Sequence, residues 1–188
     1  MSIETPDWSK FPIPRDDGAT RHLVGMPVAS APLPATDGTT VDLSSLRGIV
    51  VVYTYPRTGR PGIENPPGWD LIPGARGCTP QSCAFRDHFG ELRVLGVSHL
   101  LGLSTQDTFY QREAAERLHL PFPLLSDAHL TFTMGMRLPT FETSGMTLLK
   151  RLTLVIKDGI IEHVFYPVFP PDQNASEVMV WLAARSRL

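Results

Sequence analysis

The chain has 188 residues, with 17 lysines and arginines against 19 aspartates and glutamates, and 42% of it is hydrophobic. This length suits one domain that folds without disulfide or metal support. The net charge of −2 argues against nucleic-acid or membrane partners, because such binding needs a basic surface. No apolar run approaches the roughly 20 residues of a membrane span, and residues 1–14 lack the apolar segment of a signal peptide. We therefore expect a cytoplasmic protein.

Turn residues and β-branched runs predict the first elements. Residues 1–20 are rich in proline and predict a loose tail before a single domain over 21–188. The turn signal Asp37-Gly38-Thr39 predicts a small hairpin with a strand over 41–46. Residues 48–55, GIVVVYTY, have the composition of a central strand that is buried on both faces.

A long loop and a helix are expected next. Residues 56–77 are rich in proline and glycine and have neither helical nor alternating periodicity. A loop of about 20 residues inside a domain is either functional or disordered, and its end directly before Cys78 favours function. Apolar residues at helical spacing then predict a helix over 80–95, which Gly96 stops in the left-handed conformation.

Strands and helices alternate in the rest of the chain. The predicted elements are a strand over 99–104, a helix over 107–118, strands over 151–156 and 160–165 joined by an Asp158-Gly159 turn, and a helix over 174–185. Alternation predicts crossover connections, and the closing hairpin makes the sheet mixed. We therefore predict an α/β, thioredoxin-like fold, with a mixed central sheet flanked by helices and an N-terminal β-hairpin extension.

The two cysteines of the chain, Cys78 and Cys83, lie at the start of the predicted helix. Proline is favoured at the first helical position, so Pro80 predicts Thr79 as the N-cap. Amide groups and the dipole at a helix start stabilise an anion, and the thiolate is the nucleophilic form of cysteine. Nucleophilic chemistry at Cys78 is therefore one interpretation.

Two other interpretations of this pair remain open. A residue before the N-cap and one inside the first turns often pack together as a hydrophobic staple, so both cysteines could be inert core residues. A zinc site is less favoured, because the five-residue spacing lacks the close pairing of zinc cysteines and no paired histidines follow. We expect no bound metal. The absent CxxC motif argues against a thioredoxin-type reductase.

Several segments resemble those of a known family when taken in this order. They are YP at 55–56, GCTPQSCAFRD at 77–87, GLSTQ at 102–106, LPFPLLSD at 120–127 and RLTLVIKDGIIEHVF at 151–165. Together they resemble peroxiredoxins, above all the Q-type or bacterioferritin-comigratory group. The resemblance begins near residue 23, since residues 23–48 are similar to the family's N-terminal hairpin.

The resemblance implies a role for each matching residue. Cys78 matches the peroxidatic cysteine, and Cys83 matches the resolving cysteine that forms a disulfide with it. Arg151, the first residue of its predicted strand, matches the arginine that stabilises the thiolate and the charge on the leaving oxygen. Pro56 matches the proline that opens the catalytic loop and shields the thiolate. Thr79 joins this set as the neighbour of Cys78.

The resemblance also implies the reaction. A thiol peroxidase would reduce hydrogen peroxide or organic hydroperoxides, without metal or organic cofactor, and a thioredoxin-like protein or small thiol would recycle it. The expected assembly is a monomer or a homodimer. Two alternatives from other classes are a redox sensor with the same disulfide and a non-catalytic module whose loop binds a partner through Trp69 and Leu71.

The sequence departs from the family pattern in the catalytic loop. The family has Thr or Ser three residues before the peroxidatic cysteine, where this chain has Ala75. Pro56 lies farther from Cys78 than in the family, which indicates an insertion of about 15 residues within 62–77. Thr58 is a candidate for the missing hydroxyl, and we expect the insertion to shape the entrance to the thiol.

The implied disulfide has a geometric consequence. If both cysteines are helical, their Cα atoms lie about 8.7 Å apart. Disulfides need a Cα separation of roughly 4.4–6.8 Å. We therefore expect the first helical turn to unwind before Cys83 reaches Cys78.

Overall fold

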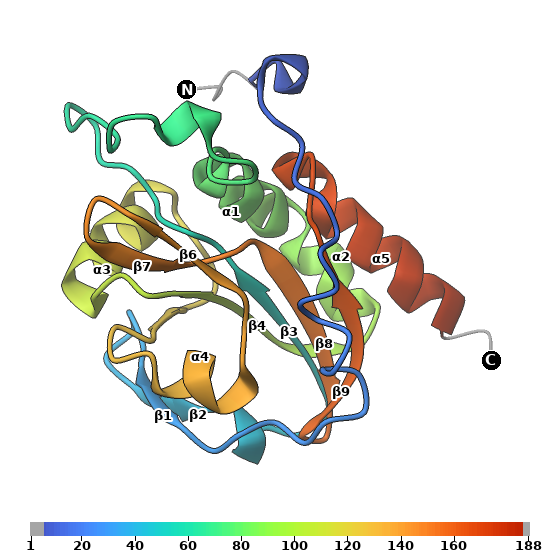
Figure 1. Cartoon of the computed structure of the whole chain (residues 1–188). Coiled ribbons are helices and arrows are strands. Elements are labelled where there is room, and N and C mark those ends of the chain that lie inside the picture. Colours follow the sequence, from blue (N-terminus) through green and yellow to red (C-terminus); the bar gives the residue numbers. More distant parts are fainter. Residues whose placement is uncertain (1–5, 186–188) are drawn as a thin grey trace.

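The computed structural model describes residues 6–185, which are built around a five-stranded mixed sheet (Figure 1). The strand order is β5-β4-β3-β8-β9, so β3 (Ile49–Thr54) is central. It pairs in parallel with β4 (Val97–Ser104) and antiparallel with β8 (Leu152–Lys157). The edge strands are β5 (Leu124–Ser126), parallel to β4, and β9 (Ile160–Phe165), antiparallel to β8. The predicted mixed α/β sheet is confirmed.

Both faces of the sheet are covered, because side chains along a strand alternate between its two sides. On one face the core is closed by α1 (Cys78–Asp87), α2 (Phe89–Val94) and α5 (Asn174–Arg185) (Figure 1). On the other face it is closed by the hairpin of β1 (Pro32–Pro34) and β2 (Thr40–Asp42) together with α4 (Thr131–Met136). The central strand is therefore buried on both sides, as its composition predicts.

The remaining elements lie at the edges. Helix α3 (Thr108–Arg117) packs beside β5, and β6 (Thr140–Thr143) pairs with β7 (Met146–Leu149) in a separate hairpin. Short 3-10 turns are η1 (Trp8–Lys10), η2 (Leu43–Ser45), η3 (Trp69–Leu71) and η4 (Pro171–Gln173). Within residues 6–185, no helix combines the length and apolarity that crossing a bilayer needs.

Three predicted boundaries need correction. The helix expected over 80–95 is two helices, since His88 leaves the helical region at φ −98° and ψ 10°. The strand expected over 41–46 ends at Asp42, whose side chain accepts from the amide of Ser44 and starts a 3-10 turn. Arg151 lies one residue before β8 rather than opening it.

The N-terminal segment is also more ordered than its composition predicts. Residues 1–5 lie outside the described residues, but residues 6–20 are not loose. The ring of Trp8 packs edge-on against Phe169 at 6.0 Å. The carboxylate of Asp17 accepts from Lys150 Nζ at 2.8 Å and from the Tyr166 hydroxyl at 2.9 Å. These contacts fix the segment beside the sequence that leads into Arg151.

Candidate active site

Cys78 is the first residue of α1 and is only 4% exposed. Gly77 caps this helix with φ +106°, in the left-handed region that favours glycine. A Cβ at Gly77 would lie 2.3 Å from Pro171 Cγ and 2.8 Å from the Trp8 ring, so no larger residue fits. No side chain caps the helix. Its first amide groups have no intrahelical partners, so they can donate hydrogen bonds to an anion at Cys78.

This geometry corrects the expected start of the helix. Thr79 is not the N-cap; it is the second helical residue, and Pro80 is the third. The staple interpretation placed Cys78 before the cap, whereas the structure places it inside the helix. The sequence rule failed because Gly77 can adopt a left-handed cap that its neighbours cannot. Both cysteines are therefore helical, the condition on which the estimate of their separation rests.

Arg151 is 3% exposed and joins Cys78 to the end of the catalytic loop. Its Nη2 lies 3.3 Å from Cys78 Sγ. The same nitrogen donates to the backbone carbonyls of Gly74, Ala75 and Arg76 at 3.2–3.3 Å. A buried guanidinium with fixed partners is a preorganised positive charge beside the sulfur.

A buried polar network holds Arg151 from behind. Its Nη1 donates to Gln81 Oε1, and Gln81 Nε2 donates to Asn174 Oδ1 at 3.0 Å. The same Asn174 oxygen accepts from Thr153 Oγ1 at 2.6 Å. Gln81, Thr153 and Asn174 are fully buried and connect α1, β8 and α5. Gln81 follows Cys78 by three residues, a helical spacing that could have revealed it; Asn174 carries no such signal in the sequence.

Cys83 lies in the second turn of α1, where its surroundings differ. It is 8% exposed and, like Cys78, a free thiol. Burial raises the pKa of Cys83, and the positive charge of Arg86 opposes this only in part. The closed helix therefore keeps Cys83 as a neutral thiol.

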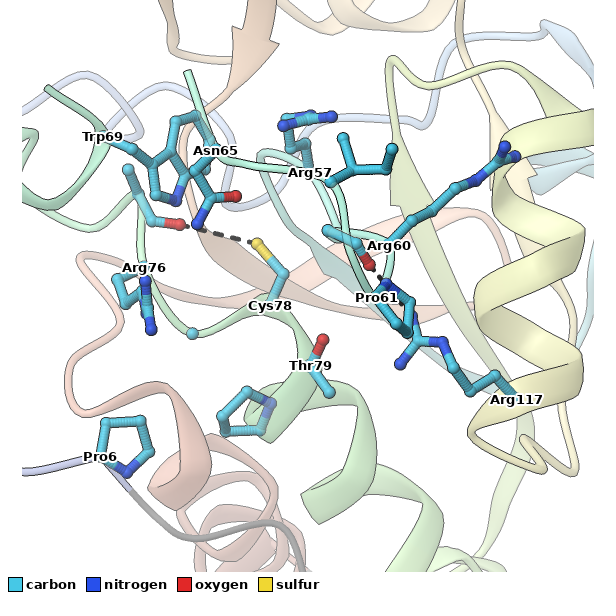
Figure 2. Close-up of a pocket in the computed structure, with 15 residues that line it drawn as sticks. Pro6, Arg57, Arg60, Pro61, Asn65, Trp69, Arg76, Cys78, Thr79 and Arg117 are labelled. Carbon is cyan, nitrogen blue, oxygen red and sulfur yellow. Dashed lines mark hydrogen bonds between the residues drawn. The ribbon is translucent and has the colours of Figure 1, made fainter. Parts of the chain in front are cut away.

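A cavity of about 330 Å³ opens beside the Cys78 sulfur (Figure 2). We call it the Cys78 cavity. Its lining includes Pro6, Thr79, Arg117 and seven residues of the loop, namely Arg57, Gly59, Arg60, Pro61, Ile63, Asn65 and Trp69. Figure 2 shows Cys78 between Trp69 and Asn65 on one side and Pro61 and Arg117 on the other. The inserted loop thus forms one wall of this cavity.

The loop is attached to the fold at both ends. At its start, Pro56 is buried, and the amide and hydroxyl of Thr58 both donate to Gln106 Oε1. Thr58 is therefore not the missing hydroxyl, since it is not among the residues that line the Cys78 cavity. At its end, Ala75 is fully buried in an apolar cluster with Trp69 and Leu148. Ala75 also lines the Cys78 cavity, so the position of the family's Thr or Ser is kept while its hydroxyl is missing.

Comparison with known proteins agrees with this geometry. The Redoxin family matches residues 23–179. Chloroplastic peroxiredoxin Q of Triticum aestivum is 30% identical over 176 residues, which cover 89% of this chain and 73% of the relative. Peroxiredoxin Bcp of Escherichia coli is 32% identical over 155 residues, which cover 80% of this chain and 88% of the relative. The crystal structure of the Mycobacterium tuberculosis peroxidoxin BcpB superposes with a TM-score of 0.69 at 30% identity, covering 87% of this chain and 98% of BcpB.

The chain belongs to the peroxiredoxins. It is a thiol peroxidase of the Q or Bcp type, and the predicted thioredoxin-like fold is confirmed. In this peroxiredoxin the single described hydroxyl that lines the Cys78 cavity belongs to Thr79, directly after the cysteine. Within residues 6–185, no group of three or more His, Cys, Asp and Glu side chains is arranged to hold a metal.

Proposed function

We propose that Cys78 is the peroxidatic cysteine of this peroxiredoxin. The observation that carries the proposal is the 3.3 Å contact between Arg151 Nη2 and Cys78 Sγ at the start of α1. The thiolate attacks one peroxide oxygen, so an S–O bond forms while the O–O bond breaks. The leaving oxygen takes a proton and departs as water or an alcohol, and Cys78 becomes a sulfenic acid.

Arg151 and Thr79 are proposed to orient the peroxide. The guanidinium stabilises the thiolate and the negative charge that grows on the leaving oxygen. The Thr79 hydroxyl borders the Cys78 cavity, while the side chain of Ala75 lacks a hydroxyl. Replacement of Thr79 by valine should therefore slow the oxidation of Cys78, and replacement by serine should slow it less.

Cys83 is proposed to resolve the sulfenic acid. Its sulfur attacks Cys78, an S–S bond forms, and the hydroxide that leaves takes up the proton of the Cys83 thiol to give water. Two helical residues five apart lie about 8.7 Å from each other at Cα, so the first turn of α1 unwinds before the bond forms. That movement takes Gln81 away from Arg151 and opens the network that holds the guanidinium.

A dithiol or thiol then restores the enzyme. Reduction of the Cys78–Cys83 disulfide needs two electrons, which we propose come from a thioredoxin-like protein or from a small thiol. Two free buried thiols suit a reducing compartment, so we propose that the protein works in the cytoplasm. Cell fractionation tests the location.

Intact-protein mass spectrometry tests the cysteine assignments. Reduced protein receives one equivalent of peroxide, and a thiol-alkylating reagent is then added. The wild type should take up no label and lose two hydrogens. Cys83→Ser should gain one oxygen at Cys78, while Cys78→Ser should keep its label and lose peroxide turnover. Turnover retained in Cys78→Ser would reject the assignment.

Amide hydrogen exchange tests the unwinding. Residues 78–85 should exchange faster in the disulfide form than in the reduced form, because the first helical turn has lost its hydrogen bonds. Helix α5 serves as the internal reference. Equal protection of residues 78–85 in both states, with the disulfide demonstrably formed, would show that the helix does not open.

A further inference from the structure

Asn174 is a fully buried polar residue at the start of α5, and it is not among the residues that line the Cys78 cavity. Its Oδ1 accepts two hydrogen bonds, from Gln81 Nε2 at 3.0 Å and from Thr153 Oγ1 at 2.6 Å. Helices α1 and α5 lie side by side on the same face of the sheet (Figure 1). The Asn174 side chain therefore connects α5 to the helix that carries Cys78.

The sequence around Asn174 predicts a local role that the structure does not show. Asparagine is a favoured N-cap, and Glu177 follows at the spacing of a capping box. Asn174, however, already has helical dihedral angles, φ −60° and ψ −41°. Its side-chain oxygen accepts from Gln81 and Thr153 rather than from the first amides of α5. The side chain therefore serves a contact between elements and not the end of its own helix.

The hydrogen bonds of Gln81 have a fixed direction. A guanidinium can only donate, so the Gln81 atom that faces Arg151 Nη1 must be the amide oxygen. The amide nitrogen then faces the other way and needs an acceptor, because an unpaired buried donor lowers stability. The Asn174 oxygen is that acceptor. A half-turn of the Gln81 amide would set N–H groups against Arg151 and a carbonyl oxygen against Asn174 Oδ1, so both contacts would be lost.

The orientation of Gln81 matters because the guanidinium of Arg151 has few other fixed contacts. Its Nη2 is shared between Cys78 Sγ and three loop carbonyls, all at 3.2–3.3 Å. Its Nε has no hydrogen-bond partner among the described residues. Within residues 6–185, Gln81 is the single partner of Nη1. The Gln81 oxygen therefore decides how the guanidinium is turned towards the sulfur.

We infer that Asn174 is a positioning residue for peroxide reduction. It holds the Gln81 amide with its oxygen towards Arg151, and it thereby holds the guanidinium at the Cys78 sulfur. The hydroxyl of Thr153 supports Asn174 from β8. This rests on the proposed roles of Cys78 and Arg151 and adds a residue to that same site, one that does not touch the peroxide.

The variant Asn174→Leu tests the inference, because leucine has the same branched outline but no hydrogen-bonding atom. Oxidation of the reduced protein by hydrogen peroxide is followed in a stopped-flow instrument through the fluorescence of Trp69, which lines the Cys78 cavity. The rate constant should fall about tenfold, the scale of one hydrogen bond to a charged group. An unchanged rate in the folded variant would overturn the inference.

The matched control is Val178→Ala. Val178 is fully buried on the same helix and has no polar side-chain atom. Its truncation lowers the stability of the fold but should leave the oxidation rate unchanged. An equal loss of rate in Val178→Ala and Asn174→Leu would show that the rate depends only on the packing of α5, and it would reject the positioning role.

A second background separates orientation from packing. In Gln81→Glu the side chain presents an oxygen at both positions, so Arg151 finds an acceptor whichever way the carboxylate turns. Selection by Asn174 is then unnecessary, and adding Asn174→Leu should leave the rate of Gln81→Glu unchanged. A structural role of Asn174 would slow both backgrounds by the same factor, since effects that do not interact are additive in free energy. That result would overturn the inference.

Thr153→Val keeps the test decisive if Asn174→Leu does not fold. Valine has the shape of threonine without the hydroxyl, so Asn174 Oδ1 loses one of its two donors. The oxidation rate should fall about twofold to threefold, the scale of one neutral hydrogen bond. It should not fall further when the same change is made in Gln81→Glu. In that case an unaltered rate in Thr153→Val itself would overturn the inference.

Two further variants separate this inference from the proposed function. If Arg151→Ala slows the oxidation of Cys78 and Asn174→Leu does not, only the positioning role of Asn174 is overturned. If Cys78→Ser retains peroxide turnover, the proposed function fails whatever the result at Asn174.

Discussion

The two cysteines of α1 are both buried and only five residues apart, yet their surroundings are opposite. Cys78 faces a buried guanidinium, the backbone carbonyl of Ala75 at 3.7 Å and a basic cavity. Cys83 lies inside the helix, where burial raises its pKa. The same residue type thus lies beside a fixed positive charge at one position and in surroundings that raise its pKa at the other.

This contrast shows which contacts the reaction must keep and which it must break. The contacts of Arg151 reach the loop, α1 and, through Gln81 and Asn174, helix α5. Those of Cys83 depend on the closed helix. A resolving step that unwinds α1 from Cys78 as far as Cys83 would therefore remove both the burial of Cys83 and the Gln81 support of Arg151. Substitutions near Cys78 and near Cys83 should therefore affect different steps, the oxidation of Cys78 and the formation of the disulfide.

The largest effect is expected from Arg151→Ala. Loss of the guanidinium should slow the oxidation of Cys78 by on the order of 10²-fold or more, the scale of one preorganised donor. Stopped-flow kinetics of the reduced protein measure this. The oxidation rate of Arg151→Lys should lie between those of the wild type and Arg151→Ala. An ammonium keeps the charge but cannot reach the three loop carbonyls and Gln81 together. An unchanged rate in folded Arg151→Ala would reject the role.

Shortening the loop should alter the access to Cys78. Replacement of residues 62–68 by a short linker removes the cavity lining at Ile63 and Asn65 but keeps the anchor Trp69, which is 4% exposed. We expect the rate ratio of cumene hydroperoxide to hydrogen peroxide to rise several-fold, because a wider entrance favours the larger substrate. Competition kinetics give the ratio directly. The same ratio in both proteins would show that the loop does not control access.

The pH dependence of disulfide formation should reflect Cys83. Its pKa is raised in the closed helix, so the closed form binds more protons than the open form once the pH exceeds the exposed thiol value of about 8.5. Opening therefore costs less as the pH rises, and more Cys83 thiolate is present in the open form. The conversion of sulfenic acid to disulfide should accelerate steadily between pH 6 and 9. Arg86→Gln should shift this curve to higher pH, because Arg86 lowers the Cys83 pKa. A flat profile would contradict this account.

The smallest effect is expected from Asp17→Asn. The hydrogen bond from Lys150, followed by that from Tyr166, lowers the pKa of Asp17 to about 2. The lowered pKa stabilises the folded protein at pH values above 3.8, the ordinary pKa of the carboxyl group. This stabilisation is lost as the pH falls towards 2. Because the pair is largely exposed, the variant should lower the melting temperature only slightly at pH 7. The two proteins should melt alike near pH 2, and a difference that persists there would implicate another interaction.

The sequence alone determined the elements whose signals are local. A β-branched run predicted β3, and the Asp158-Gly159 turn, with both residues at positive φ, predicted the hairpin of β8 and β9. Gly96 at φ +92° ends the α1–α2 segment as expected. The order of motifs identified the family. The sequence did not reveal four elements, namely β5, α4, β6 and β7, because segments of three to six residues carry little periodicity.

Only the tertiary structure decided how the Cys78 thiol is surrounded. The space for a side chain at Gly77 is taken by Trp8 and Pro171, residues far away in sequence. The contact of Arg151 with Cys78 depends on the strand order, which brings the start of β8 beside the start of α1. The loop over 56–77 lines the Cys78 cavity because it is anchored on the β6–β7 hairpin through Trp69 and on α3 through the Gly59 carbonyl. Local sequence fixes backbone preference, but the charge and shape around a buried sulfur come from residues that only folding brings together.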